Sequence, residues 1–492
     1  MRSSGVLMHI SSLSSPYGVG TLGKEAREFV DFLEKAGQTY WQILPICPTS
    51  YGDSPYASYS TFAGNPYFID LDLLEKKGLL KKEEYAEVDW ENVPDKVNYG
   101  ALYEKRYPIL RMATRRFLKN PPKSYAVFCA DNAFWLDDYA LFMTIKNINS
   151  GLSWTDWERP LKNHEAGALE KVSTEYSDDI GFWKAIQFLF FEQWNDLLAY
   201  ANERKIDIIG DLPFYVAFDS VDAWAHPELF QLDENRVPLG VAGCPPDGFS
   251  PTGQLWGNPL YAWEFHENSG YAWWIQRIGY LTKVYNVLRI DHFRAFDFYF
   301  SIPYGAEDAS GGEWKEGPGM KLFNAMENAI GPQRIIAEDL GYITESLKKL
   351  LKDSGFPGMK ILEFAFDTRE PSHEDYLPYN YPSHCVAYTG THDNDTVQGW
   401  FESARPEDTS FAKDYLHLDD PKDYHWGMMW ALWSSAAELA IVQAQDLLGL
   451  GSESRMNTPS TTGTNWSWRA LPDSFDDELA WKLGHYTKLY GR

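Results

Sequence analysis

The sequence predicts an α/β protein built on a (β/α)₈ barrel, or TIM barrel. Four short apolar runs, at 206–211, 284–291, 335–339 and 385–395, read as buried strands, and carboxylates stand at the end of each. Predicted helices alternate with these runs, and in a barrel the carboxyl ends of all strands form the face that carries the chemistry. A structural Asp–Arg ion pair could explain one such run, but the repetition favours a shared site.

Taken in order, the apolar patterns predict eight strands, at 6–10, 40–46, 206–211, 284–290, 334–338, 360–364, 386–390 and about 440–445. Amphipathic patterns predict helices at 24–36, 271–285, 317–330 and 344–354. Residues 426–446 read as a long apolar helix that runs into the last strand, so the boundary between helix and strand is open there.

The domain expectation is one catalytic barrel over residues 1–492 with two insertions. Residues 71–200 are rich in helical, charged patterns without acid-ended strands, which predicts an inserted, mainly helical subdomain. Residues 213–262 are rich in Gly, Pro and aromatics and predict a lid-like subdomain over the active face, where it would exclude water. The chain ends soon after its last polar loop, so no C-terminal β-domain is expected.

Composition narrows the class of protein. The chain has 44 basic and 70 acidic residues, a net charge of −26, which disfavours nucleic acid and membrane surfaces as partners. No apolar run of about 18 residues and no secretory leader pattern occurs, so the cytoplasm is expected. Four scattered cysteines, at positions 47, 129, 244 and 385, fit a reducing compartment. The 20 Trp and 30 Tyr fit core packing, and those in polar loops also suit sugars.

The run Leu288–Arg294 carries the central chemical prediction. Strand residues alternate faces, so Arg289 and Asp291 point the same way, and the guanidinium favours the charged form of that carboxylate. Glu338 has apolar neighbours, and loss of water around it would raise its pKa. Asp393, after His392, could bind sugar hydroxyls and stabilise positive charge. An ionised and a protonated carboxyl group on neighbouring strands suit glycosidic cleavage.

Other chemistries have weaker support. Asp291, His292, His392 and Asp393 could in principle hold a metal, but adjacent strand residues face opposite sides, so no metal is expected. No phosphate-binding glycine loop follows a strand and no Gly-x-Ser-x-Gly occurs, so no cofactor and no serine nucleophile are expected.

At this point the motifs resemble a known family. The segments 289–294 (RIDHFR), 336–341 (IAEDLG) and 390–396 (GTHDNDT) resemble the catalytic segments of the 4-α-glucanotransferases, or amylomaltases, of glycoside hydrolase family 77. Further similar segments, in family order, are 52–56, 210–213, 245–250, 253–259 and 455–459. Residues 11–16 depart from the family pattern, and they lie outside these motifs.

The resemblance implies an α-amylase-type barrel and a retaining double displacement, in which a segment of a 1,4-α-D-glucan passes to the 4-OH of glucose or a maltooligosaccharide. It implies Asp291 as nucleophile, Glu338 as general acid/base and Asp393 as transition-state stabiliser. It also implies a set of substrate-binding residues: Tyr56, Asp211, Asp247, Trp256, Arg289, His392 and Asn465.

Two alternatives stay open on the sequence alone. The first is an α-amylase-type hydrolase of α-1,4-glucans with the same three acids, because transfer and hydrolysis differ only in whether sugar or water reaches the intermediate. The second is a non-catalytic glucan-binding protein that uses aromatic loops, although such a protein has no need of the buried acid.

Overall fold

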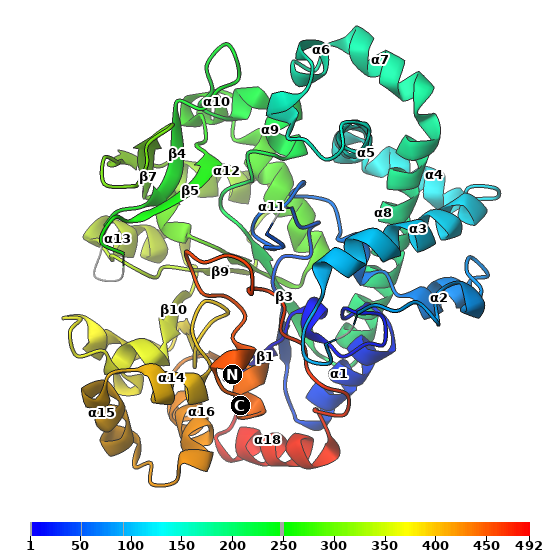
Figure 1. Cartoon of the computed structure of the whole chain (residues 1–492). Coiled ribbons are helices and arrows are strands. Elements are labelled where there is room, and N and C mark those ends of the chain that lie inside the picture. The colour runs from blue at the N-terminus through cyan, green and yellow to red at the C-terminus, as the bar shows by residue number, and fades with distance from the viewer. Residues whose placement is uncertain (1, 51, 92, 247–249) are drawn as a thin grey trace.

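The computed structural model describes residues 2–50, 52–91, 93–246 and 250–492, and a parallel sheet of eight strands lies at its centre (Figure 1). Its strands pair in the order β10-β11-β12-β1-β2-β3-β6-β9, and the Ala337 N–H donates to Pro357 O at 3.0 Å where the two end strands β9 and β10 meet, which closes the barrel. The predicted barrel is confirmed. Its strands are β1 (Ser3–Leu7), β2 (Tyr40–Gln42), β3 (Asp207–Leu212), β6 (Val287–Ile290), β9 (Ile335–Ala337), β10 (Gly358–Ile361), β11 (Cys385–Tyr388) and β12 (Leu439–Gln443).

The strands are apolar on both faces because one face fills the barrel and the other lies under helices. Val6, Ile208 and Leu288 are fully buried. Several strands are shorter than predicted. Only residues 358–361 of the sixth strand pair with β11, and Leu362–Phe366 form a 3-10 helix instead. The boundary left open within 426–446 lies between residues 434 and 439: the helix ends at Ser434, and pairing with β1 makes Leu439–Gln443 a strand, close to the predicted 440–445.

Helices cover the outside of the barrel, and the four that the sequence predicts lie within about three residues of their expected limits. In α13, the Thr344 side chain accepts from the Leu347 N–H at the start, and Gly355 ends the helix in a left-handed conformation. The covering helices are α1 (Lys24–Lys35), α11 (Ala272–Val284), α12 (Met320–Ile330), α13 (Glu345–Ser354), α14 (Val397–Ser403), α15 (Pro406–Leu416), α16 (Tyr424–Ser434), α17 (Ala444–Leu447) and α18 (Asp477–Leu489).

The chain between β2 and β3 is mainly helical. Arg106, fully buried in this region, donates to Tyr17 O at 3.2 Å and Ile69 O at 2.6 Å, and so fixes the region to the loops of the barrel. Whether it is a separate subdomain stays a prediction. Its helices are α2 (Leu71–Lys76), α3 (Tyr99–Phe117), α4 (Lys123–Asp131), α5 (Ala133–Ile148), α6 (Arg159–Lys162), α7 (Ala166–Glu175) and α8 (Ser177–Glu203).

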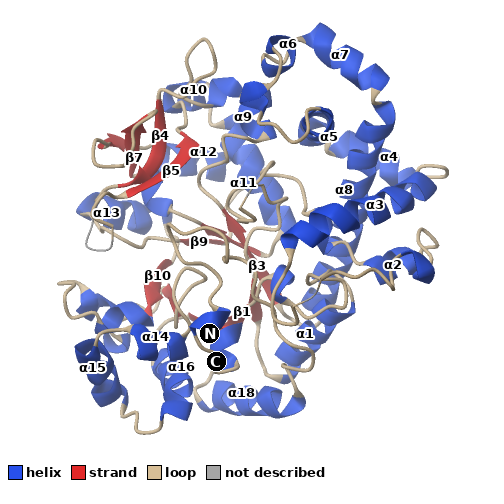
Figure 2. Ribbon diagram, in the orientation of Figure 1, coloured by secondary structure: helices blue, strands red, loops and turns tan. Residues whose placement is uncertain are grey.

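A second, antiparallel sheet lies beside the barrel mouth, in strand order β5-β4-β7-β8 (Figure 2). Two of its strands, β4 (Gly240–Cys244) and β5 (Gln254–Pro259), lie in the predicted 213–262 lid, next to α9 (Val221–Ala225) and α10 (Trp263–Asn268). The other two, β7 (Phe298–Pro303) and β8 (Glu313–Glu316), come from the loop after β6 and were missed from the sequence. Among the described helices, none has the length and apolar character needed to cross a membrane.

Candidate active site

The barrel brings the acid-bearing strand ends to one mouth. Asp211 lies in β3 directly opposite Arg289 of β6, and Asp291 follows β6 by one residue. Glu338 likewise follows β9, whose register sets Ala337 opposite Ile290. Asp291 and Glu338 therefore extend from neighbouring strands at the same level, where parallel strands lie about 4.8 Å apart.

Arg289 joins two carboxylates. Its Nη1 donates to both Asp211 oxygens, at 2.8 and 2.7 Å, and to Asp291 Oδ1 at 3.1 Å. Burial alone would lower the pKa of Arg289, but the charges of Asp211 and Asp291 raise it well above its usual range. Asp211 is buried, whereas the Asp291 side chain is 27% exposed, so Asp291 is the carboxylate of this pair that a ligand can reach.

Glu338 is the acid of the site that holds a proton. Burial and then the charge of Asp291 raise its pKa to about 8, against the opposing effect of Arg289. Its oxygens accept from the His292 N–H at 2.6 Å and the Leu340 N–H at 3.1 Å, which fixes the carboxyl group. With this raised pKa, Glu338 keeps its proton at neutral pH, and it lies one strand away from Asp291, the carboxylate that contacts Arg289.

Asp393 is held on the other side of the mouth by residues that the prediction missed. Asn457 Nδ2 donates to Asp393 Oδ1 at 2.6 Å, and Arg455 Nη2 donates to the Asp393 carbonyl at 2.5 Å. His392 Nε2 lies 3.4 Å from Asp393 Oδ2. Asn457 and Arg455 lie in a motif that resembles the family, but nothing in their spacing assigns them to this carboxylate.

Tyr56 connects the Asp393 side of the mouth to Arg289 and its two carboxylates. Its ring stacks on His392, with centroids 4.9 Å apart and 15° between the planes, and its hydroxyl donates to Asp211 Oδ2 at 2.7 Å. A continuous chain of contacts thus runs from Asp393 through His392, Tyr56 and Asp211 to Arg289, which also contacts Asp291. These six predicted residues are brought together in this way, with Glu338 beside them.

The remaining predicted residues lie farther out or cannot be placed. Trp256, 38% exposed on β5, meets the edge of the His292 ring at 4.9 Å. Asn465 uses its side chain within its own loop, where it accepts from the Thr458 N–H at 3.1 Å and donates to Thr461 O at 3.0 Å. Asp247 lies outside the described residues.

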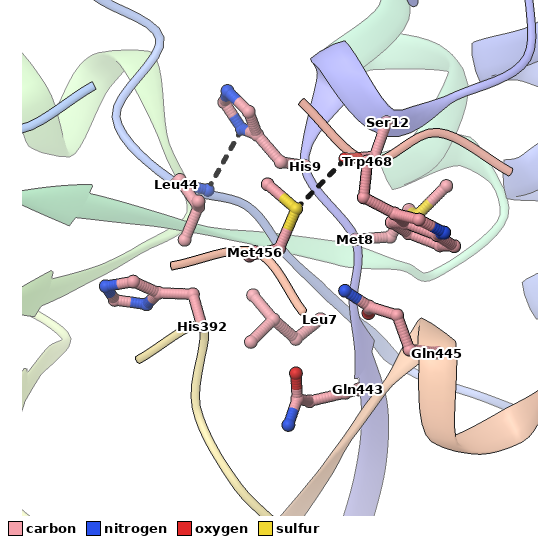
Figure 3. Close-up of a pocket in the computed structure, with 10 residues that line it drawn as sticks. All are labelled: Leu7, Met8, His9, Ser12, Leu44, His392, Gln443, Gln445, Met456 and Trp468. Carbon is pink, nitrogen blue, oxygen red and sulfur yellow. Dashed lines mark hydrogen bonds between the residues drawn. The ribbon is translucent and has the colours of Figure 1, made fainter. Parts of the chain in front are cut away.

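A small cavity lies directly behind His392 (Figure 3). The His9 ring points away from the His392 ring, and its Nδ1 accepts from the Leu44 N–H at 3.3 Å. Burial, and then the charge of His392, lower the pKa of His9 to about 3, so His9 is neutral. The lining residues are Leu7, Met8, His9, Ser12, Leu44, His392, Gln443, Gln445, Met456 and Trp468.

A second buried acid group lies behind the loop that carries Asp393. Glu363, two residues after β10, has an Oε1 atom without a hydrogen-bond partner among the described residues. Burial and then the charges of Asp446 and Asp395 raise the pKa of Glu363 well above its usual range. Asp446 accepts from Thr389 Oγ1 at 2.6 Å and the Val397 N–H at 2.8 Å. A lone Glu in an apolar run gives no sign of this surrounding in the sequence.

The comparisons with known proteins agree with this geometry. The family model described as 4-alpha-glucanotransferase matches residues 8–473. The chain is 50% identical to a 4-alpha-glucanotransferase of Clostridium butyricum, covering 99% of this chain and 100% of that one. It is 44% identical to a 4-alpha-glucanotransferase of Thermus thermophilus, and the match covers 98% of this chain and 97% of that one.

Solved structures give the same result. An amylomaltase from Streptococcus agalactiae in complex with acarbose superimposes with a TM-score of 0.97 at 41% identity and covers 100% of both chains. An amylomaltase from Corynebacterium glutamicum, 19% identical, shares the fold with a TM-score of 0.77 and covers 100% of this chain and 75% of that one. Sequence, family model and structure thus agree over nearly the whole length, and the chain belongs to the 4-α-glucanotransferases of glycoside hydrolase family 77, the amylomaltases.

Proposed function

We propose that this transferase works by a retaining double displacement on Asp291 and Glu338. Asp291 Oδ attacks the anomeric carbon of the donor sugar while the Glu338 proton passes to the glycosidic oxygen, so that the C–O bond breaks and the leaving chain departs as an alcohol. Glu338, now ionised, then takes the proton of the acceptor 4-OH, and that oxygen displaces Asp291. The observation that carries the proposal is the position of Asp291, held by Arg289 at 3.1 Å, on the strand next to that of Glu338, whose pKa burial and the charge of Asp291 raise.

The change of charge during the reaction supports the double use of Glu338. The charge of Asp291 helps to raise the pKa of Glu338. When Asp291 becomes an ester it loses that charge, and the pKa of Glu338 falls. The same group therefore carries a proton to donate in the first step and stays ionised as a base in the second.

The donor ring fits the chain of contacts around Arg289. Asp211 and His392 would bind hydroxyls of the ring at the cleavage point, Tyr56 would stack on it, and Asp393, held by Asn457, would face the developing positive charge. The substrates are maltooligosaccharides, amylose or other α-1,4-glucans, with glucose or an oligosaccharide as acceptor. The acarbose complex of the Streptococcus agalactiae amylomaltase supports this substrate class.

The outer residues would serve the rest of the glucan. Trp256 on β5 would cover the acceptor side, as part of the lid over residues 213–262, and Asn465 would lie near the donor chain. Asp247 is assigned to the substrate only through the family resemblance. We place the reaction in the cytoplasm, where the scattered cysteines would stay reduced.

Incubation with maltotriose tests the proposal. The transferase is expected to release glucose and form a ladder of oligomers longer than maltotriose, whereas a hydrolase forms only shorter products. Asp291→Asn should lower turnover by about a thousandfold or more while maltotriose still binds, because only the nucleophile is lost. Residual transfer near the wild-type rate in this variant would remove Asp291 from the mechanism. Asp477→Asn, an exposed change on α18, is the control.

A further inference from the structure

We propose that an aromatic ledge, made of Trp314, Arg294 and Tyr342, binds the acceptor glucan beyond the sugar that reacts. The proposal rests on the double displacement above, because it places the ledge on the side where Glu338 acts. The ledge is made by two neighbouring barrel loops, the one after β6 that carries Asp291 and the one after β9 that carries Glu338.

The three side chains form a stack. The Arg294 guanidinium lies 4.0 Å from the Trp314 ring centroid and 5.8 Å from that of Tyr342. Arg294 is buried, and the edge of Trp314 packs at 5.1 Å against the buried Phe300 of β7. Contacts between a guanidinium and an aromatic face strengthen when water is excluded, so this arrangement holds the rings in place.

The backbone under Tyr342 is fixed from both sides. Arg294 Nη1 donates to the Tyr342 carbonyl. Two residues on, Thr344 Oγ1 donates to Asp297 Oδ2 at 3.2 Å, and Ser346 Oγ donates to the same oxygen at 2.7 Å. Loop positions that are held in this way lose little entropy when a ligand binds.

The exposed surface of the ledge has no use in the fold. Tyr342 is 75% exposed and Trp314 38%, although a tyrosine ring on a fixed loop could bury its apolar face at little cost. Flat exposed rings suit a pyranose, which has an apolar face of C–H groups and a polar rim.

The position of the ledge beside Glu338 indicates which part of the glucan it binds. Leu340, whose N–H holds Glu338, is two residues from Tyr342. Glu338 protonates the leaving oxygen and later activates the acceptor, so the leaving and incoming chains pass along this side of the mouth. The donor ring, by contrast, lies among Tyr56, Asp211 and His392. The ledge is thus an acceptor-side site for an α-1,4-glucan chain, and glucose is too short to use it.

The test compares acceptors of different length. In Tyr342→Ala, the ratio of kcat/KM for maltotriose as acceptor to that for glucose should fall about tenfold, because one stacked ring is lost. Tyr342→Phe should keep the wild-type ratio, and Trp314→Ala should lower it. Trp481→Ala is the matched control, since that ring is 71% exposed on α18, a helix that lies apart from β7 and α13, the labelled elements next to the ledge, in Figure 1, and the ratio should not change.

The outcomes separate this site from the mechanism. An unchanged ratio in Tyr342→Ala, or an equal fall for both acceptors, overturns the ledge while the Asp291 mechanism stands. If Asp291→Asn keeps its turnover, the mechanism fails whatever the acceptor ratios are. A loss in Tyr342→Phe as large as that in Tyr342→Ala would contradict stacking and assign the effect to the hydroxyl.

Discussion

Glu338 shows how one residue takes its chemistry from its neighbours. The side chain accepts two backbone hydrogen bonds, which favour the ionised form, but burial and Asp291 prevail and raise its pKa to about 8. Asp291, one strand away, is instead in contact with Arg289. Glu338 is thereby suited to donate a proton, whereas Asp291 lies against a guanidinium, and acid-assisted displacement requires two carboxyl groups in such different surroundings.

This difference predicts the pH dependence of the first step. For a maltooligosaccharide donor, kcat/KM should fall above about pH 8, by about tenfold per pH unit, because ionised Glu338 has no proton for the leaving oxygen. The measurement is a pH profile with maltotriose. A glycosyl fluoride donor is the control, because fluoride leaves without a proton and its profile should lack this limb. A limb shared by both donors would assign the titration to another group.

At the scale of elements, the antiparallel sheet extends the barrel mouth. Trp256 of β5 meets His292, whose N–H holds Glu338, and also lies 6.2 Å from the Tyr215 ring. Burial lowers the pKa of His292 to about 4, so the ring is neutral and packs as an aromatic group. The sheet thereby puts an apolar, half-exposed side chain against His292, the residue whose backbone N–H binds Glu338, the proposed acid/base.

This arrangement predicts that Trp256→Ala shifts the enzyme from transfer toward hydrolysis. Water should reach the glycosyl-enzyme more often, and hydrolysis relative to transfer should rise several-fold, by about 1 kcal/mol in relative barrier. New reducing ends from maltotriose measure hydrolysis, because transfer conserves their number. Trp256→Phe should retain most of the wild-type ratio. An unchanged ratio in the alanine variant would count against the lid.

On the scale of the whole molecule, buried titratable groups set how stability depends on pH. In the folded chain Glu338 and Glu363 keep protons that the unfolded chain releases above about pH 4.5, so the free energy of unfolding falls as the pH rises, through about 8 for Glu338. Buried histidines act at the acid side. Below about pH 6.5 four histidines bind protons in the unfolded chain, whereas in the folded chain they bind them only near pH 4 or lower, so the free energy of unfolding falls as the pH drops. These histidines are His9, His266, His292 and His425.

Together these effects predict the highest Tm between about pH 6 and 7, with a fall on the alkaline side. Glu363→Gln should reduce the fall between pH 6.5 and 9 by about 1–2 °C, because it removes a buried group that must ionise. Thermal unfolding at one scan rate measures this. Glu345→Gln, whose side chain is 90% exposed, should keep the wild-type slope. Equal slopes in both variants would show that the folded chain does not hold a proton on Glu363 that the unfolded chain has released in this range.

The sequence by itself determined the barrel, the mouth and the acids. Apolar runs that end in carboxylates can be recognised locally, because a strand buried on both faces must be apolar throughout and the change to charge marks where it leaves the core. The sequence also placed Arg289 beside Asp291, since residues two apart on a strand share a face.

Only the tertiary structure decided which distant groups meet. The limits of the last strand depended on pairing with β1, and β7 and β8 became strands through pairing with β4 and with each other. The contact of Asn457 with Asp393, the approach of Asp446 to Glu363 and the stack of Arg294 on Trp314 join segments separated by 20 to more than 80 residues. Such contacts leave no periodic trace, because hydrogen bonds, burial and charge act through space, and their partners are known only when the chain has folded.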